Sequence, residues 1–223
     1  MAEPVTVVIS ATALIVSAIT AWLTLFRRGR VRMTQPTVIF FGPDGGLPTR
    51  EPRPKVFLRT LLFSTSKRGR VVESIHVRLS RGETRQNFNI WVYGDDKLVR
   101  GSGLFVGETG IATNHHFLLP EDAPQFRFAA GTYLLQVFAR ILGEKIHKLL
   151  FSQTLEVTDN LARALEDVLC GLYFDWGPDS VRYLPHIDRR IPALSSDRML
   201  EFLARAASGA LGDESEKTLP RNP

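Results

Sequence analysis

Hydrophobic and polar positions divide the chain into three regions with different periods. From Pro4 to Phe26 no side chain is charged, and these 23 residues are enough for a helix to cross a hydrocarbon core about 30 Å thick. Between Pro36 and Val157, short apolar runs alternate with turn residues, and from Thr158 apolar residues recur every three or four positions. The pattern predicts a single N-terminal transmembrane helix plus a mainly-β domain, followed by two C-terminal α-helices.

The middle region predicts an antiparallel β-sandwich of about 7–8 strands. Its apolar runs are rich in Val, Ile, Phe, Leu and Tyr, and the separators carry the Gly, Pro and Asp that tight turns need. The eight expected strands are residues 37–41, 55–64, 70–80, 86–93, 97–106, 111–119, 132–142 and 145–157. Strands of this number and spacing are typical of a two-layer sandwich.

Alternation within a strand assigns its side chains to two faces. In residues 87–93, Phe88, Ile90 and Val92 form one row, which places Trp91 and Tyr93 on the opposite, outer face. We therefore expect Trp91 and Tyr93 either to bind a partner or to lie beneath the C-terminal helices, since large exposed apolar patches are uncommon on monomers.

The C-terminal region predicts helices. Leu161, Leu165, Val168 and Leu172 form one helical stripe, and a second helix is expected over residues 195–211. The predicted organisation is an anchor and basic segment over 1–32, a β-sandwich over 33–157, a helical extension over 158–211 and a disordered tail over 212–223.

The charges that flank the apolar helix predict its orientation. Arg27, Arg28, Arg30 and Arg32 follow it, and no basic residue precedes it. Under the positive-inside rule the N-terminus then faces out and the β domain lies in the cytoplasm at a plasma membrane, which in a bacterium is the inner membrane. The alternative is an export signal cleaved near 16–18 and a periplasmic β domain, although the basic segment that opens such signals is missing.

Composition is compatible with this location. The formal net charge is +5, and the one cysteine, Cys170, cannot form an internal disulfide. Arginines beside a membrane favour contact with anionic lipids, so we expect the lipid bilayer rather than nucleic acid as a partner.

Small and hydroxyl-bearing residues form a stripe along the apolar helix. They are spaced alternately by four and three residues, which permits close helix approach and self-association in lipid, or bonds from each hydroxyl to its own helix carbonyls. The stripe consists of Thr6, Ser10, Ala13, Ser17, Thr20 and Thr24.

Candidate chemistry is sparse, and we expect no catalytic residue, no cofactor and no metal site. His115 and His116 are adjacent in a strand and therefore point to opposite faces. Asp95 and Asp96 fall in a turn, and Cys170 fits a buried filler. The sequence thus predicts a protein that is not an enzyme.

Five arginines close together around one predicted hairpin form a candidate surface for an anionic ligand or a partner, or else a solvated charged face. They are Arg68, Arg70, Arg78, Arg81 and Arg85.

The segment PQFRFAAGTYLLQVFAR, residues 124–140, resembles the late hairpin of immunoglobulin-like and fibronectin-III-like domains. The resemblance implies a β-sandwich in which Tyr133 bonds back to the preceding loop, as in a tyrosine corner. It implies no partner or activity.

Two functions fit these patterns. The first is a membrane-anchored, non-enzymatic scaffold whose β domain binds a protein partner. The second is a sensor-effector of the layout found in some antiphage proteins, in which the β domain binds an anionic ligand or nucleotide and clusters the spans.

Overall fold

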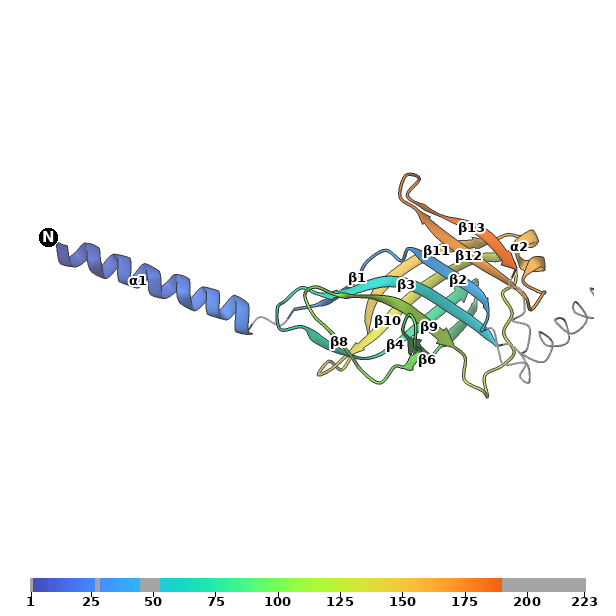
Figure 1. Cartoon of the computed structure of the whole chain (residues 1–223), viewed down its shortest axis with the longest axis horizontal. Helices are drawn as coiled ribbons and strands as arrows, with labels where there is room; N and C mark the ends of the chain where they lie inside the picture. The colour runs from blue at the N-terminus through green and yellow to red at the C-terminus, as the bar shows by residue number, and fades with distance from the viewer. Residues whose placement is uncertain (1, 27–28, 45–52, 190–223) are drawn as a thin grey trace, which may run out of the picture. The chain divides into compact units, whose positions relative to one another are not determined.

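The computed structural model describes residues 2–26, 29–44 and 53–189. The chain begins with helix α1 (Ala2–Ala21), which continues into a π-helical turn, η1 (Trp22–Phe26) (Figure 1). Within this pair, Glu3–Thr24 is long and apolar enough to cross a membrane, and none of it is buried against the rest of the protein. A signal sequence would meet the same criterion, so the structure shows an apolar N-terminal helix compatible with either role.

The rest of the described chain is two antiparallel sheets (Figure 1). The first sheet has the order β13-β12-β2-β3-β9-β6-β7, and β1 also pairs with β3. The second has the order β11-β10-β4-β5, and β8 also pairs with β4. The strands of the first sheet are β1 (Val31–Met33), β2 (Val38–Pro43), β3 (Pro54–Ser64), β6 (Ile90–Tyr93), β7 (Val99–Arg100), β9 (Ile111–Leu118), β12 (Cys170–Gly177) and β13 (Arg182–Arg189). Those of the second are β4 (Arg70–Arg81), β5 (Thr84–Phe88), β8 (Leu104–Val106), β10 (Gly131–Ile141) and β11 (Lys148–Val157).

The core lies between the two sheets and forms one continuous apolar cluster. Phe41 of β2 meets Tyr133 of β10 with 5.8 Å between ring centroids, so the facing layers touch directly. Leu58 of β3 and Val77 of β4 are also fully buried. The expected two-layer β architecture is confirmed.

All eight expected strand segments contain strands, but residues 86–93 are divided between the two sheets. β5 ends at Phe88 in the second sheet, and β6 begins at Ile90 in the first. Crossing between layers at Asn89 reverses the alternation, because a residue must then face the opposite direction to point into the core. Phe88 and Trp91 both point inward, and Trp91 is only 3% exposed. The expectation that Trp91 lies on the outer face was therefore wrong.

The expected helix over 158–171 was also wrong beyond its first turns. Helix α2 covers only Asp159–Ala164, and the chain then forms β12 and β13. β12 pairs with both β2 and β13, and it buries Leu172 and Phe174 completely or nearly so. This pairing and burial outweigh a helical stripe, since local periodicity is a weak preference that packing overrides. The β domain consequently continues to Arg189, while the expected helix at 195–211 and the tail at 212–223 lie outside the described residues.

Candidate functional site

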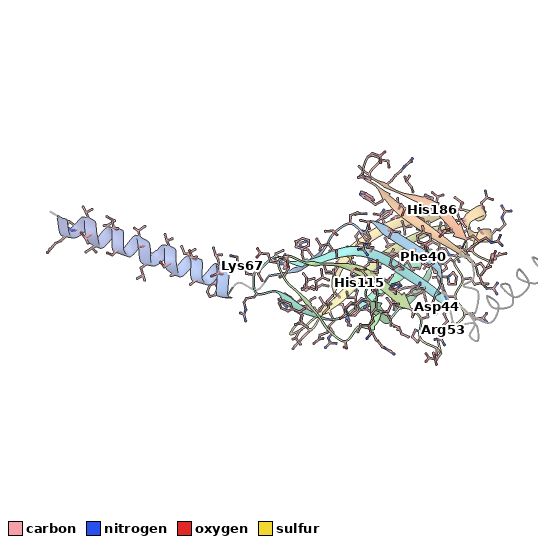
Figure 2. The ribbon with its side chains drawn as sticks, viewed as in Figure 1. Phe40, Asp44, Arg53, Lys67, His115 and His186 are labelled. Carbon is pink, nitrogen blue, oxygen red and sulfur yellow. The ribbon has the colours of Figure 1, made fainter. Side chains whose placement is uncertain are left out.

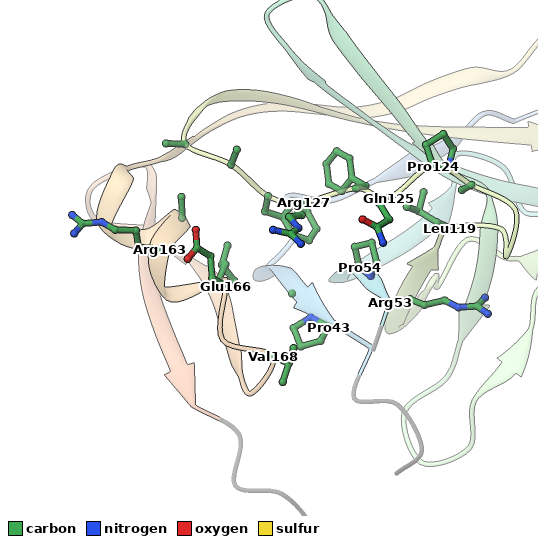
Figure 3. Close-up of a pocket in the computed structure, with 18 of the residues that line it drawn as sticks. Pro43, Arg53, Pro54, Leu119, Pro124, Gln125, Arg127, Arg163, Glu166 and Val168 are labelled. Atoms are coloured by element: carbon green, nitrogen blue, oxygen red, sulfur yellow. The ribbon is translucent and has the colours of Figure 1, made fainter. Parts of the chain in front are cut away.

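An open cleft of about 1420 Å³ lies at one end of the sandwich (Figure 3). The end of β2, the start of β3, the connection from β9 to β10, and α2 with the residues after it form its walls. The side chains that define it best are Pro43, Arg53, Pro54, Leu119, Pro124, Gln125, Arg127, Arg163, Glu166 and Val168.

Alternating aromatic residues hold the β9–β10 connection in place. Phe128 stacks on Phe41 with 5.0 Å between centroids, and Phe126 meets Phe88 edge-on at 5.6 Å. Because these two rings point into the core, Arg127 between them is exposed and lines the cleft.

Hydrogen bonds fix the end of the same connection. Tyr133 Oη donates to the Ala129 carbonyl at 2.8 Å, the bond expected of a tyrosine corner. Arg81 Nη1 donates to the Ala130 carbonyl at 2.7 Å. Burial raises the pKa of Tyr133 above its usual value, so its hydroxyl stays a donor.

Charged side chains at the cleft include both signs. Arg53 forms an ion pair with Glu121 at 2.9 Å, and its backbone N–H donates to Asp44 at 3.2 Å. Arg163 donates to Asn160 within α2. The Arg127 carbonyl accepts from the Ala129 N–H at 3.0 Å, but the Arg127 guanidinium has no partner among the described residues, and this fork of donors suits a carboxylate or carbonyl group.

The lining of the cleft combines apolar side chains with a few charged ones. Apolar side chains and prolines dominate the lining, and the described lining contains no Ser, Thr, Cys, His, Tyr or Lys. Its titratable side chains are the carboxylates of Glu121, Asp159 and Glu166 and the guanidinium groups of Arg53, Arg127 and Arg163. An apolar cleft with a few directed polar groups is typical of a binding site.

The structure also reveals a buried imidazole that the sequence pattern did not predict. His115 is fully buried, and its Nδ1 accepts a hydrogen bond from Trp91 Nε1 at 3.2 Å (Figure 2 labels His115). Its Nε2 is buried without a hydrogen-bond partner among the described residues. Burial, reinforced by the charge of His116, lowers the pKa of His115 to about 4, so the ring is neutral near pH 7.

His115 and His116 do point to opposite faces of the sheet, as expected for adjacent strand residues. His116 packs on Phe57 with 4.9 Å between ring centroids, whereas His115 lies on the face of the sheet that carries the Trp91 ring, with 6.1 Å between centroids. Among the described residues, no group of three or more His, Cys, Asp or Glu is arranged to hold a metal ion.

The other candidate pair, Trp91 and Tyr93, does not form an exposed surface. Tyr93 is half-buried and stacks on the buried Trp91 with 4.9 Å between centroids. A sequence signal for this burial exists in hindsight, because Gly101 leaves room for the Trp91 ring against which a Cβ would collide.

The five candidate arginines are separated rather than gathered. Arg70 and Arg81 lie at opposite ends of β4, about 36 Å apart at the rise of an extended strand. Arg78 stacks on Phe138 at 4.7 Å, Arg68 belongs to the turn before β4, and Arg85 lies in β5 opposite Ser80. A single anionic-ligand surface over all five is therefore not formed, because proximity in sequence becomes distance in an extended strand.

The candidate residues near the N-terminus are placed as follows. Arg30 and Arg32 are exposed, whereas Arg27 and Arg28 lie outside the described residues. In the helix, Thr20 Oγ1 donates to the Val16 carbonyl at 2.8 Å and Thr24 Oγ1 donates to the Thr20 carbonyl at 2.7 Å. Self-association through the stripe of Thr6, Ser10, Ala13, Ser17, Thr20 and Thr24 stays a prediction.

Comparison of the chain with protein-family models, with curated proteins and with solved structures finds no match.

Proposed function

We propose that this chain is a single-pass, membrane-anchored, non-enzymatic interaction protein whose cleft binds a segment of a protein partner. The observation that carries the proposal is the placement of the cleft. It lies at one end of β3, and the segment that leads from the apolar helix joins the sandwich at the other end. In Figure 2, Arg53 at the cleft and Lys67 beside that junction mark opposite ends of the sandwich.

The apolar helix supports the anchor. Within the 22-residue segment Glu3–Thr24, the most apolar 18 residues are not buried against the described β domain, so their side chains need another nonpolar environment. The following arginines, Arg27, Arg28, Arg30 and Arg32, favour an N-terminus outside and a cytoplasmic β domain. We infer a bacterial inner membrane as the location.

The distance between the two ends supports a presenting role. From Ser64 to Pro54, β3 spans about 33 Å at the rise of an extended strand. A binding cleft at the far end of a tethered domain is accessible to proteins beside the membrane. The mixed-sign lining with exposed Arg127 suits a mainly apolar peptide segment that carries a carboxylate.

Membrane fractionation tests the anchor. The full chain is expected to stay in membranes after alkaline extraction with its first residues intact, and Leu14→Arg with Ile15→Arg should release it, because each charge at the centre of a span costs about 3 kcal/mol. A mature chain trimmed within the apolar helix would instead show that this helix is an export signal.

Site-specific photocrosslinking in cells tests the cleft. With p-benzoylphenylalanine in place of Gln125, which lines the cleft, we expect a discrete adduct that Arg127→Glu abolishes. The matched control places the crosslinker at Ser152, an exposed position of β11. Equal adducts at both positions, or an adduct that is indifferent to Arg127→Glu, would contradict binding at the cleft.

A further inference from the structure

Three loops meet at the end of the sandwich where the chain arrives from the apolar helix. They are the β3–β4 turn (65–69), the segment around Phe105 in β8, and the β10–β11 turn (142–147). Phe105 pairs with Val71 at the start of β4, and the N–H of Leu142 donates to the Val71 carbonyl at 2.9 Å. The three loops therefore lie side by side.

Arg70 joins these loops to the incoming chain. Its guanidinium donates to the Gly29 carbonyl at 3.2 Å, to the Leu142 carbonyl at 3.4 Å and to Glu144 at 2.9 Å. Arg70 is thus engaged within the protein, and its role is to hold this end together.

Backbone bonds fix the incoming chain to the β3–β4 turn. The N–H of Gly29 donates to Ser66 Oγ at 3.1 Å, and the N–H of Arg30 donates to Thr65 Oγ1 at 2.9 Å. A Cβ at position 29 would overlap Ser66, which explains the glycine. Gly29 follows Phe26 by three residues, which span at most about 11 Å, so the loops stay close to the end of the helix.

Many of the exposed side chains at this end are apolar or basic. Ile146 is 75% exposed and Phe105 59%, and Leu142 and Leu149 are also exposed. The exposed basic residues of the same end are Arg30, Arg32, Lys67, Arg68, Lys145 and Lys148. Of the acidic residues there, Glu144 is paired with Arg70 at 2.9 Å and Lys148 at 3.3 Å, and Glu108 is exposed.

Exposed apolar residues among basic ones fit the boundary between lipid headgroups and acyl chains. We propose that this end of the sandwich, the Phe105/Ile146 surface, docks onto an anionic lipid bilayer. The inference rests on the proposed membrane anchor and adds a second, lipid-dependent contact made by the β domain itself. The short connection makes the bilayer the partner nearest to this surface, and docking directs the cleft away from the membrane.

Fluorescence in lipid nanodiscs tests the docking with the full chain. An environment-sensitive dye is attached to Ile146→Cys, with Cys170→Ser to remove the natural thiol. The matched control carries the dye at Val181→Cys, which is equally exposed but lies in the β12–β13 turn. In discs that contain phosphatidylglycerol, we expect blue-shifted emission and quenching by spin-labelled lipid at position 146, and neither at position 181.

Two comparisons decide the result. In discs of phosphatidylcholine alone the signal at position 146 should fall, and in anionic discs Lys67→Gln with Lys145→Gln should lower the ratio of docked to undocked domains by about 30-fold. Equal signals in both lipids, water-like emission in both, or no effect of the two substitutions would overturn the docking. A chain that does not co-purify with discs would contradict the anchor itself, and with it the premise of the docking.

Discussion

Two buried side chains of this sandwich, Tyr133 and His115, carry polar atoms. Tyr133 has its hydroxyl bonded to a loop carbonyl, whereas His115 has one ring nitrogen bonded and the other without a partner in the described chain. A buried polar atom is costly unless it is bonded, so the two residues should differ in their effects on stability.

Tyr133→Phe removes the hydroxyl and keeps the ring in its aromatic contacts. We expect the free energy of unfolding to fall by about 1 kcal/mol, because the partly buried Ala129 carbonyl loses its donor. Tyr93→Phe is the matched control, since the Tyr93 hydroxyl lies 3.5 Å from its acceptor, at the limit of a hydrogen bond. Urea unfolding of both variants measures the difference, and equal losses would count against the tyrosine corner as a stabilising contact.

His115 makes stability dependent on pH. Its pKa is about 4 in the folded protein against 6.5 in the unfolded chain, so the unfolded state takes up a proton first as the pH falls. The stability that the neutral ring provides is complete above about pH 6.5 and is lost progressively down to about pH 4, by about 3 kcal/mol in total.

Unfolding at a series of pH values checks this prediction. His115→Phe should flatten the stability profile between pH 6.5 and pH 4 relative to the natural protein, even if its stability at pH 7 is lower. Phe117→Leu, at a neighbouring buried ring that does not titrate, is the control and should lower stability without changing the slope of the profile. An unaltered slope in His115→Phe would show that other groups cause the acid sensitivity.

Single strands and helices show what the local pattern can predict. Strands β3, β9 and β10 follow from alternation alone, because each remains in one sheet and buries every second residue, and β4 does so from Ile75 to Leu79. The switch between sheets at Asn89 was not predictable in this way, since alternation does not reveal which strand is the neighbour. The spacing of Leu161, Leu165 and Leu172 likewise predicted one long helix, because a local pattern does not show that Leu172 pairs in a sheet as part of β12.

The cleft could not be predicted from the sequence, because a local pattern does not show which distant segments meet in the fold. Its walls come from four separate segments, and only the fold brings Pro43, Arg127 and Glu166 together. The tyrosine-corner bond of Tyr133 was predictable because it is local, whereas the face of the candidate residue Trp91 depended on the sheet that β6 joins.

The β12–β13 hairpin contains a strained turn. Val181 has a φ of +51° and is 73% exposed, and a β-branched residue in the left-handed region is disfavoured by about 1–2 kcal/mol. Val181→Asn should therefore raise the free energy of unfolding by about 1 kcal/mol, because Asn tolerates this conformation. Val168→Asn, which is also exposed but lacks a positive φ, should change it little. Thermal unfolding compares the two variants, and a loss of stability in Val181→Asn would rule out the strain.

At the scale of the whole molecule, Arg70 links the incoming chain to the β domain. Arg70→Ala removes three hydrogen bonds and should lower the free energy of unfolding by about 2 kcal/mol, because its side chain is mostly buried. Arg140→Ala, which breaks a more exposed ion pair with Glu73, should cost less than about 1 kcal/mol.

Hydrogen exchange separates a local effect of Arg70→Ala from a global one. The amides of Gly29 and Arg30 should exchange faster in this variant than in the natural protein. Without Arg70 the Gly29 carbonyl loses its donor, and the segment is then held to the β3–β4 turn only by the bonds to Ser66 and Thr65. Unchanged exchange at both amides would mean that the bonds to Ser66 and Thr65 suffice to hold the segment.

The two-residue gap between Phe26 and the bonded Gly29 limits which partners the cleft can meet. In an anchored chain the near wall of the cleft stays within roughly 60 Å of the end of the span. A partner held in the same bilayer within that reach meets the cleft at a high effective concentration, so even a weak contact is mostly occupied. A protein free in solution gains no such advantage, and we therefore expect the natural partner of the cleft to be a resident of the same membrane.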